Sequence, residues 1–294
     1  MEILIENEAV RDEFTRWCEH FGAEDSYNTN ETVGLLDVLR ALFLIADFFY
    51  GQGYGIAGVG PRDANLLHSA VYRQFVSYGG KDKWSSPYER CATLVFGLVK
   101  DHPFHDANKR TGLLVLLYFL NKIGRMPTVK QSELEDFVVD IAEDKLKKYR
   151  RQRDLQKKSV DPEILFIADY IRRNSRGRDG KYYELTYREL DNRLRQFGYC
   201  LSNPHKNFID VCRIEDKRRF FGVGKSEQKL IKLAQIGFPS WKKTVGKGAI
   251  KTVREATDLT TKKGVDSATF YHDVDPLNVL IAKYEKPLER LAYR

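Results

Sequence analysis

The 294 residues suffice for one large domain or two of ordinary size, and a 42% hydrophobic content with 17 Phe and 16 Tyr provides for a sizeable core. The longest apolar run, 113–120, is too short to cross a bilayer, and the first residues lack the basic and apolar segments of a secretory signal. The sequence therefore excludes a membrane-spanning chain and predicts a cytoplasmic protein.

The net charge of +8 is unevenly distributed along the chain. Residues 1–150 carry 18 Lys and Arg against 22 Asp and Glu, a net charge of −4. Residues 151–294 carry 31 against 19, a net charge of +12. The basic second half indicates an anionic partner such as RNA, DNA or an acidic protein, with a solvated basic face as the alternative.

The first half has the apolar spacing of helices, so we expect a mainly α bundle there. The glycine-rich segment 51–61 follows a helix rather than a strand, which argues against a dinucleotide-binding fold. The run 110–122 is apolar nearly all round and should form the central helix. The predicted helices are 8–21, 32–50 capped by Thr32, 63–75, 87–100 capped by Ser86, 110–122, and one that begins with a Ser132–Glu135 capping box.

A basic stretch at 145–158 makes a natural connection, which predicts a catalytic domain over 1–150 and a small α+β domain over 160–294. The second domain has mixed helix and strand patterns and no internal repeat. Its predicted helices are 162–172, 186–198, 226–235, 249–257 and 276–294, and its predicted strands are 199–201, 208–214 and 219–223.

The run His102-Pro-Phe-His-Asp-Ala-Asn-Lys-Arg-Thr-Gly112 lies between two predicted helices and carries the clearest chemistry. Backbone N–H groups at a helix start are unpaired and bind anions, and the small turn residues Ala107 and Asn108 leave them open. Lys109 and Arg110 add positive charge at the same place. These features predict a phosphate site.

Two further residues of the run supply the remaining parts of a phosphate-transfer site. Asp106 offers a carboxylate for Mg²⁺, which binds few protein ligands and keeps phosphate oxygens around it. His102 titrates near neutral pH and is a candidate general base. Phe104 is expected to anchor the loop in the core.

This run resembles the Fic/Doc family motif HxFx(D/E)(G/A)N(G/K)R at every defined position, and the resemblance covers about residues 30–125. It implies a nucleotide-dependent transferase that uses ATP and Mg²⁺. In that resemblance His102 deprotonates a hydroxyl of a target protein, Asp106 holds the metal, and the segment 72–84 forms a flap that docks the target. The phosphates would be bound by Ala107, Asn108, Lys109 and Arg110.

Ala107 and Lys109 decide between two branches of that family. Most adenylyl-transferring members resemble HPFxxGNGR, whereas this chain has DANKR, as in Doc, a toxin that transfers the terminal phosphate of ATP to a protein. The methyl group of Ala107 narrows the predicted phosphate site, and Lys109 adds positive charge to it. We therefore expect phosphotransfer, with adenylylation as the alternative. A second alternative is an idle Fic-like scaffold whose basic half does the binding.

Several weaker patterns have simpler interpretations. A Doc-like toxin would receive an inhibitory helix, (S/T)xxxE(G/N), from a separate antitoxin; the chain's own match, Thr15–Glu19, is followed by His20, and Glu19 is expected at the surface. The segment 222–226 resembles the end of a P-loop but lacks its first glycine. Two sets of residues are expected not to bind a structural metal: His102, His105 and Asp106; and Cys200, His205 and Cys212.

Overall fold

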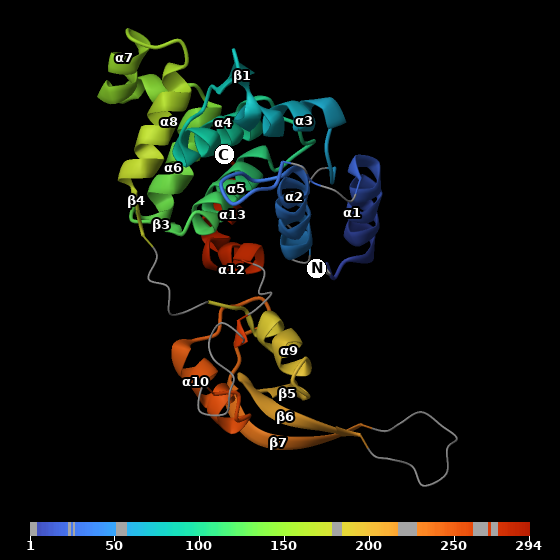
Figure 1. Cartoon of the computed structure of the whole chain (residues 1–294). Helices are drawn as coiled ribbons and strands as arrows, with labels where there is room; N and C mark the ends of the chain where they lie inside the picture. The colour runs from blue at the N-terminus through green and yellow to red at the C-terminus, as the bar shows by residue number, and fades with distance from the viewer. Residues whose placement is uncertain are drawn as a thin grey trace. The chain divides into compact units, whose positions relative to one another are not determined.

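A computed structural model of the chain shows two units (Figure 1). Contacts group residues 1–178 with 284–294 as unit 1 and residues 179–283 as unit 2. The predicted fold class is confirmed: unit 1 is mainly helical and unit 2 is a small α+β fold. The predicted domain limits, 1–150 and 160–294, stay a prediction. The structure describes residues 5–22, 25, 27–50, 58–177, 184–216, 228–260, 270–271 and 276–294.

Unit 1 is a bundle of helices with two small antiparallel ladders. Its helices are α1 (Glu8–Phe21), α2 (Leu35–Tyr50), α3 (Ala64–Tyr72), α4 (Pro87–Lys100), α5 (Asn108–Lys122), α6 (Gln131–Ala142), α7 (Arg150–Gln156), α8 (Pro162–Arg173) and α13 (Glu285–Arg290), with 3₁₀ turns η1 (Arg73–Phe75) and η2 (Lys145–Lys148). Its strands are β1 (Ser77–Tyr78), β2 (Lys81–Asp82), β3 (Arg125–Pro127) and β4 (Ser175–Gly177).

Helix α5 is the central helix, as its all-round apolar sequence predicts. It packs against α4, α2 and α6, and most of its side chains are buried. The close approach of α4 depends on Gly112, because a Cβ there would lie 2.5 Å from Cγ2 of Val99. This tight crossing fixes the start of α5, and with it the loop that carries the motif.

Of the three N-terminal helix caps predicted in unit 1, one is confirmed and two are wrong. Ser86 and Glu89 form the predicted capping box of α4. Thr32 does not cap α2: the carboxylate of Asp25 accepts from the N–H of Leu36 at 2.7 Å. The Ser132 capping box is also wrong, because α6 begins earlier, at Gln131, without a side-chain cap.

A short hairpin lies within the segment that the family resemblance assigns to the target-docking flap. Strands β1 and β2 pair antiparallel through a two-residue turn, Gly79 and Gly80, with φ of 56° and 75°. Such a turn requires positive φ at both positions, which glycine adopts without strain. Tyr78 beside the turn is 69% exposed, so the hairpin presents an aromatic side chain to solvent.

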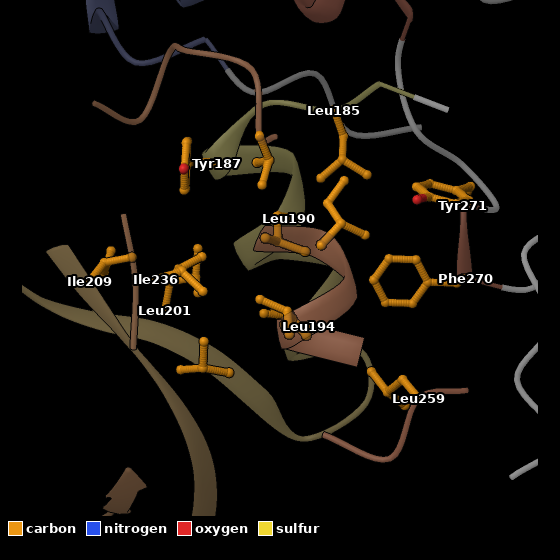
Figure 2. Close-up of a cluster of buried hydrophobic side chains, with 14 residues drawn as sticks. Leu185, Tyr187, Leu190, Leu194, Leu201, Ile209, Ile236, Leu259, Phe270 and Tyr271 are labelled. Carbon is orange, nitrogen blue, oxygen red and sulfur yellow. The ribbon is translucent and has the colours of Figure 1, made fainter. Parts of the chain in front are cut away.

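Unit 2 is a three-stranded antiparallel sheet covered by helices. Strand order is β5-β6-β7, with a bulge between Val211 and Cys212 in the β6–β7 ladder. Figure 2 shows the apolar core between sheet and helices, centred on Leu190 and Leu194 of α9. The elements are α9 (Tyr187–Arg195), β5 (Tyr199–His205), β6 (Phe208–Asp216), β7 (Gln228–Gly237), α10 (Lys247–Ala256) and α12 (Pro276–Lys283).

One predicted element of unit 2 has the wrong type. Residues 228–235 belong to strand β7, where a helix over 226–235 was expected. Pairing with the whole length of β6 explains the difference, because a ladder between distant segments overrides local spacing. The predicted strand 219–223 lies outside the described residues. No helix in the described part of the chain is long and apolar enough to span a membrane.

Candidate active site

The motif run forms a loop between α4 and α5 that Asn108 closes. Its side-chain Oδ1 accepts from the N–H of Phe104, and its Nδ2 donates to the C=O of Phe104, both at 3.0 Å. Asn108 is buried, and both polar atoms of its amide are bonded to the loop. The side chain therefore holds the loop in shape, and phosphate binding by Asn108 stays a prediction.

A second segment of chain braces this loop from outside. Pro61 forms a β-bridge with Phe104, and the N–H of Arg62 donates to the C=O of Pro103 at 2.7 Å. The Phe104 ring is 1% exposed and so anchors the loop in the core, as expected. The end of the glycine-rich segment is thus part of the site, which its sequence alone did not indicate.

The helix start beyond the loop has the geometry of an anion site. Ala107 at the N-cap of α5 has φ 64° and ψ 18°, a left-handed conformation that turns the chain sharply into the helix. The first intrahelical bond from this turn is donated by Thr111 to the C=O of Ala107. The N–H groups of residues 108–110 therefore precede the helical ladder, as in other helix N-termini that hold phosphate.

Arg110 is a buried cation at this helix start. Its side chain is 1% exposed, and one nitrogen, Nη2, lies 3.4 Å from Oδ2 of Asp106. The buried Nε and Nη1 have no hydrogen-bond partner among the described residues. Burial lowers the pKa of the guanidinium, and the charge of Asp106 opposes that effect. Unpaired buried donors are rare and costly, so their presence favours an anionic ligand here.

His102 lies at the edge of the loop with φ 47°, a left-handed conformation. His102 is exposed, but the neighbouring chain removes part of its hydration, and this desolvation lowers the pKa of His102 below its ordinary value. The positive charges of Lys109, Arg62 and Lys100 lower it further, while Asp101 acts in the opposite direction. A lowered pKa keeps the imidazole neutral near pH 7, which is the form that accepts a proton.

Asp106 is the carboxylate of the motif, with 38% of its side chain exposed. No group of three or more His, Cys, Asp or Glu side chains is placed to hold a metal in the described part of the chain. One carboxylate beside an anion site nevertheless suits Mg²⁺, which often takes one or two protein ligands and completes its shell with phosphate oxygens and water. Asp106 thus fits the predicted metal role.

The remaining predicted residues lie outside this constellation. His105 is exposed, as expected for a loop residue. Glu19 is also exposed, and the structure shows no ion pair between it and Arg110 in the described residues, where Asp106 is the partner of Arg110. Cys200 and Cys212 are buried cross-strand neighbours, whereas His205 lies at the far end of β5.

Sequence reasoning missed three groups that act on the site. Arg62 and Lys100 influence His102 from outside the motif, and Tyr293 of the C-terminal segment acts electrostatically on Arg110. Lys100 directly precedes the loop, but Arg62 and Tyr293 come from distant segments. No sequence pattern within the motif could have indicated either of them.

A proton acceptor, an anion site and cations within one short loop suit a nucleotide-dependent transferase. Residues 37–120 match the model of the Fic/DOC family. This range includes the motif loop and most of α5, as far as Leu120. The match supports a Fic-fold transferase that carries out a nucleotide-based modification. No curated protein and no solved structure matches the chain.

Proposed function

We propose that this chain is a Doc-like protein phosphotransferase, which moves the γ-phosphate of ATP to a hydroxyl group of a target protein. The observation that carries the proposal is the pair Ala107 and Lys109, where adenylyl-transferring relatives of the motif have glycine. Catalysis of phosphoryl transfer is mostly positioning and charge stabilisation. The phosphate that is held beside the acceptor hydroxyl is therefore the one transferred.

The arrangement of the loop supports this assignment. Ala107 narrows the turn at the helix start, and the charge of Lys109 acts on His102. A phosphate held by Lys109, Arg110 and the helix N-terminus would lie beside the proton acceptor. Mg²⁺ bound through Asp106 would neutralise charge on the phosphates.

In this proposal His102 takes the proton of the acceptor hydroxyl, and the hydroxyl oxygen bonds to the γ-phosphorus. The bond between the γ-phosphorus and the β–γ bridging oxygen breaks, and ADP leaves. Arg110 is suited to the phosphate oxygens because its unpaired Nε and Nη1 are already desolvated. The β1–β2 hairpin would pair with the backbone of the target beside the hydroxyl.

The biological role that follows is that of a toxin acting on a cellular protein, for example one of the translation machinery. An antitoxin would then supply the inhibitory helix, because Glu19 does not engage Arg110 in the described residues. Expression would arrest growth, and His102→Ala would abolish the arrest. Growth arrest that survives His102→Ala would instead favour a binding module built on an idle Fic-like fold.

The deciding experiment supplies ATP labelled at the α- or the γ-phosphate, in parallel, to the purified protein with a cell lysate. We expect label on protein from the γ position only. Label from the α position would overturn phosphotransfer and establish adenylylation. Mass spectrometry of the labelled band identifies the target and the acceptor residue in the same experiment.

A further inference from the structure

Unit 2 contains a pocket of about 540 Å³. That volume falls in the range of small-ligand sites and suffices for a nucleobase with its sugar. The pocket lies where the β5–β6 turn, the end of β7 and the start of α10 meet. It is lined by Tyr187, Asn207, Gly237, Phe238, Pro239, Gly246 and Ala249.

Hydrogen bonds from three directions hold the wall of this pocket in place. The hydroxyl of Tyr187 donates to the C=O of Gly237, and the N–H of Phe238 donates to the C=O of Asn207 at 2.7 Å. The N–H of Val245 donates to the C=O of Leu185 at 2.8 Å. The loop after β7 is thus pinned to α9 and to the β5–β6 turn, so the pocket exists before a ligand binds.

Aromatic rings are placed to receive a flat apolar group. The ring of Phe238 packs edge-on between Tyr187 and Trp241, with centroids 5.2 Å and 5.0 Å away. Tyr187 also belongs to the core shown in Figure 2, which fixes the base of the pocket. At its rim Phe208 follows Asn207, pairs with Gly237 and is 49% exposed. Phe208 lies opposite Gly237, whereas Phe238 packs against the core on the other face of the sheet, so the two rings provide separate stacking surfaces.

The charge around the pocket is strongly positive. Unit 2 carries 20 Lys and Arg against 13 Asp and Glu, a net charge of +7, so it holds nearly all of the chain's +8. Residues 228–254, which include five of the seven lining residues, contain seven basic residues and no acidic one. Lys206 and Lys247 are exposed and directly adjoin the lining residues Asn207 and Gly246.

We infer that this pocket and the adjoining edge of the sheet bind single-stranded nucleic acid, with one base on Phe238 in the pocket, a neighbouring base on Phe208, and the flanking phosphates on Lys206 and Lys247. Stacking on aromatic rings and a basic track for the backbone are the two parts of such sites. A base in a duplex is paired and stacked within the helix, so it cannot enter a recess. The basic run from β7 into α10 exceeds one nucleotide, which favours a polymer over a free nucleotide.

The experiment measures fluorescence anisotropy of a labelled U12 strand, and of dT12, with the full chain over a series of salt concentrations. Phe208→Ala removes an exposed ring without opening the core and should weaken binding about fivefold or more. Lys206→Ala with Lys247→Ala should reduce the slope of log K against log salt by about 1.4, from two lost phosphate contacts. Tyr50→Ala and the pair Lys157→Ala with Lys158→Ala, all in unit 1, are matched controls for ring and charge.

The expected result is binding of U12 or dT12 that both pocket variants weaken and both controls leave unchanged. Equal losses in the controls would show non-specific attraction to a basic protein and overturn the proposal. A duplex of the same length that binds as tightly as the single strand would also overturn it, as would displacement of U12 by an equal concentration of UMP. Absence of binding at 20–50 mM salt, where phosphate contacts are strongest, would overturn it as well.

Discussion

Asn108 and Phe104 are joined by a reciprocal pair of hydrogen bonds, in which the side-chain amide of one residue satisfies both backbone polar groups of the other. The family resemblance presents Asn108 as a phosphate ligand. The observed bonds add a positioning role for the loop, because one donor and one acceptor site of the amide are taken up by Phe104.

Asn108→Ala should therefore damage stability and activity together. The change leaves the buried N–H and C=O of Phe104 without these partners. Each unsatisfied buried group costs about 1–3 kcal/mol of stability. We expect the free energy of unfolding of unit 1, measured by urea denaturation, to fall by that order. Asn65→Ala, at an exposed position of α3, is the control. Lost transfer at unchanged stability would show that Asn108 contacts the nucleotide directly.

The pH–rate profile of the reaction should have an acid limb that is set by His102 and lies at lower pH than is usual for histidine. The neutral imidazole is the active form, so the rate falls as pH drops through its pKa, which desolvation and nearby cations hold below the ordinary 6.5. Arg62→Gln removes one of those cations and should move the limb to higher pH. Lys130→Gln, a surface charge change elsewhere in unit 1, should leave it in place. A limb that does not respond to Arg62→Gln belongs to another group.

Replacement of His102 tests the same assignment by rate. A positioned general base contributes about 10²–10⁴-fold, so His102→Ala should reduce transfer by that factor. His102 is exposed, and the circular dichroism and unfolding midpoint should therefore stay those of the parent protein. His105→Ala, three residues further on and also exposed, should keep full activity. Equal activities for the two variants would remove the catalytic role from His102.

Ala107→Gly should separate stability from activity. An L residue in the left-handed region costs about 1–2 kcal/mol, while the greater freedom of glycine in the unfolded chain offsets about 0.4–1 kcal/mol. The folded protein should thus gain up to about 1.6 kcal/mol, whereas Ala168→Gly within α8 should lose about 1 kcal/mol. With Lys109→Gly added, phosphotransfer should weaken. A double variant that keeps full γ-phosphate transfer would refute the role of these two residues in selecting the phosphate.

The sequence predicted those parts of the fold that depend on short-range chemistry. The capping box of α4 could be predicted because Ser86 and Glu89 satisfy each other's backbone groups within one turn. The Ser132 box failed because Glu135, its expected partner, is 2% exposed and paired with Arg290 and Arg294. Those arginines lie more than 150 residues away, so no local pattern reveals the competition.

The candidate site divides in the same way. The predicted anion site and proton acceptor both lie in one contiguous run, so the sequence alone could indicate them, and their roles stay predictions. The residues that shift the pKa of His102 and Arg110 could not be predicted from this run. Arg62 reaches the loop through the bridge between Pro61 and Phe104, and Tyr293 acts on Arg110 from the C-terminal segment. Strand β7 was missed for the same reason, since the partner that makes it a strand is the distant β6.

The ion pairs of Glu135 with Arg290 and Arg294 affect the order in which the two units can fold during synthesis. Unit 1 is assembled from two stretches of chain that unit 2 separates. Until residues 284–294 leave the ribosome, α6 presents an unneutralised carboxylate at the place where α13 will pack, and Tyr293 is not yet near the motif. Unit 1 thus begins before unit 2 in the chain and ends after it, so the basic unit, contiguous in sequence, can fold before the motif loop has its full surroundings.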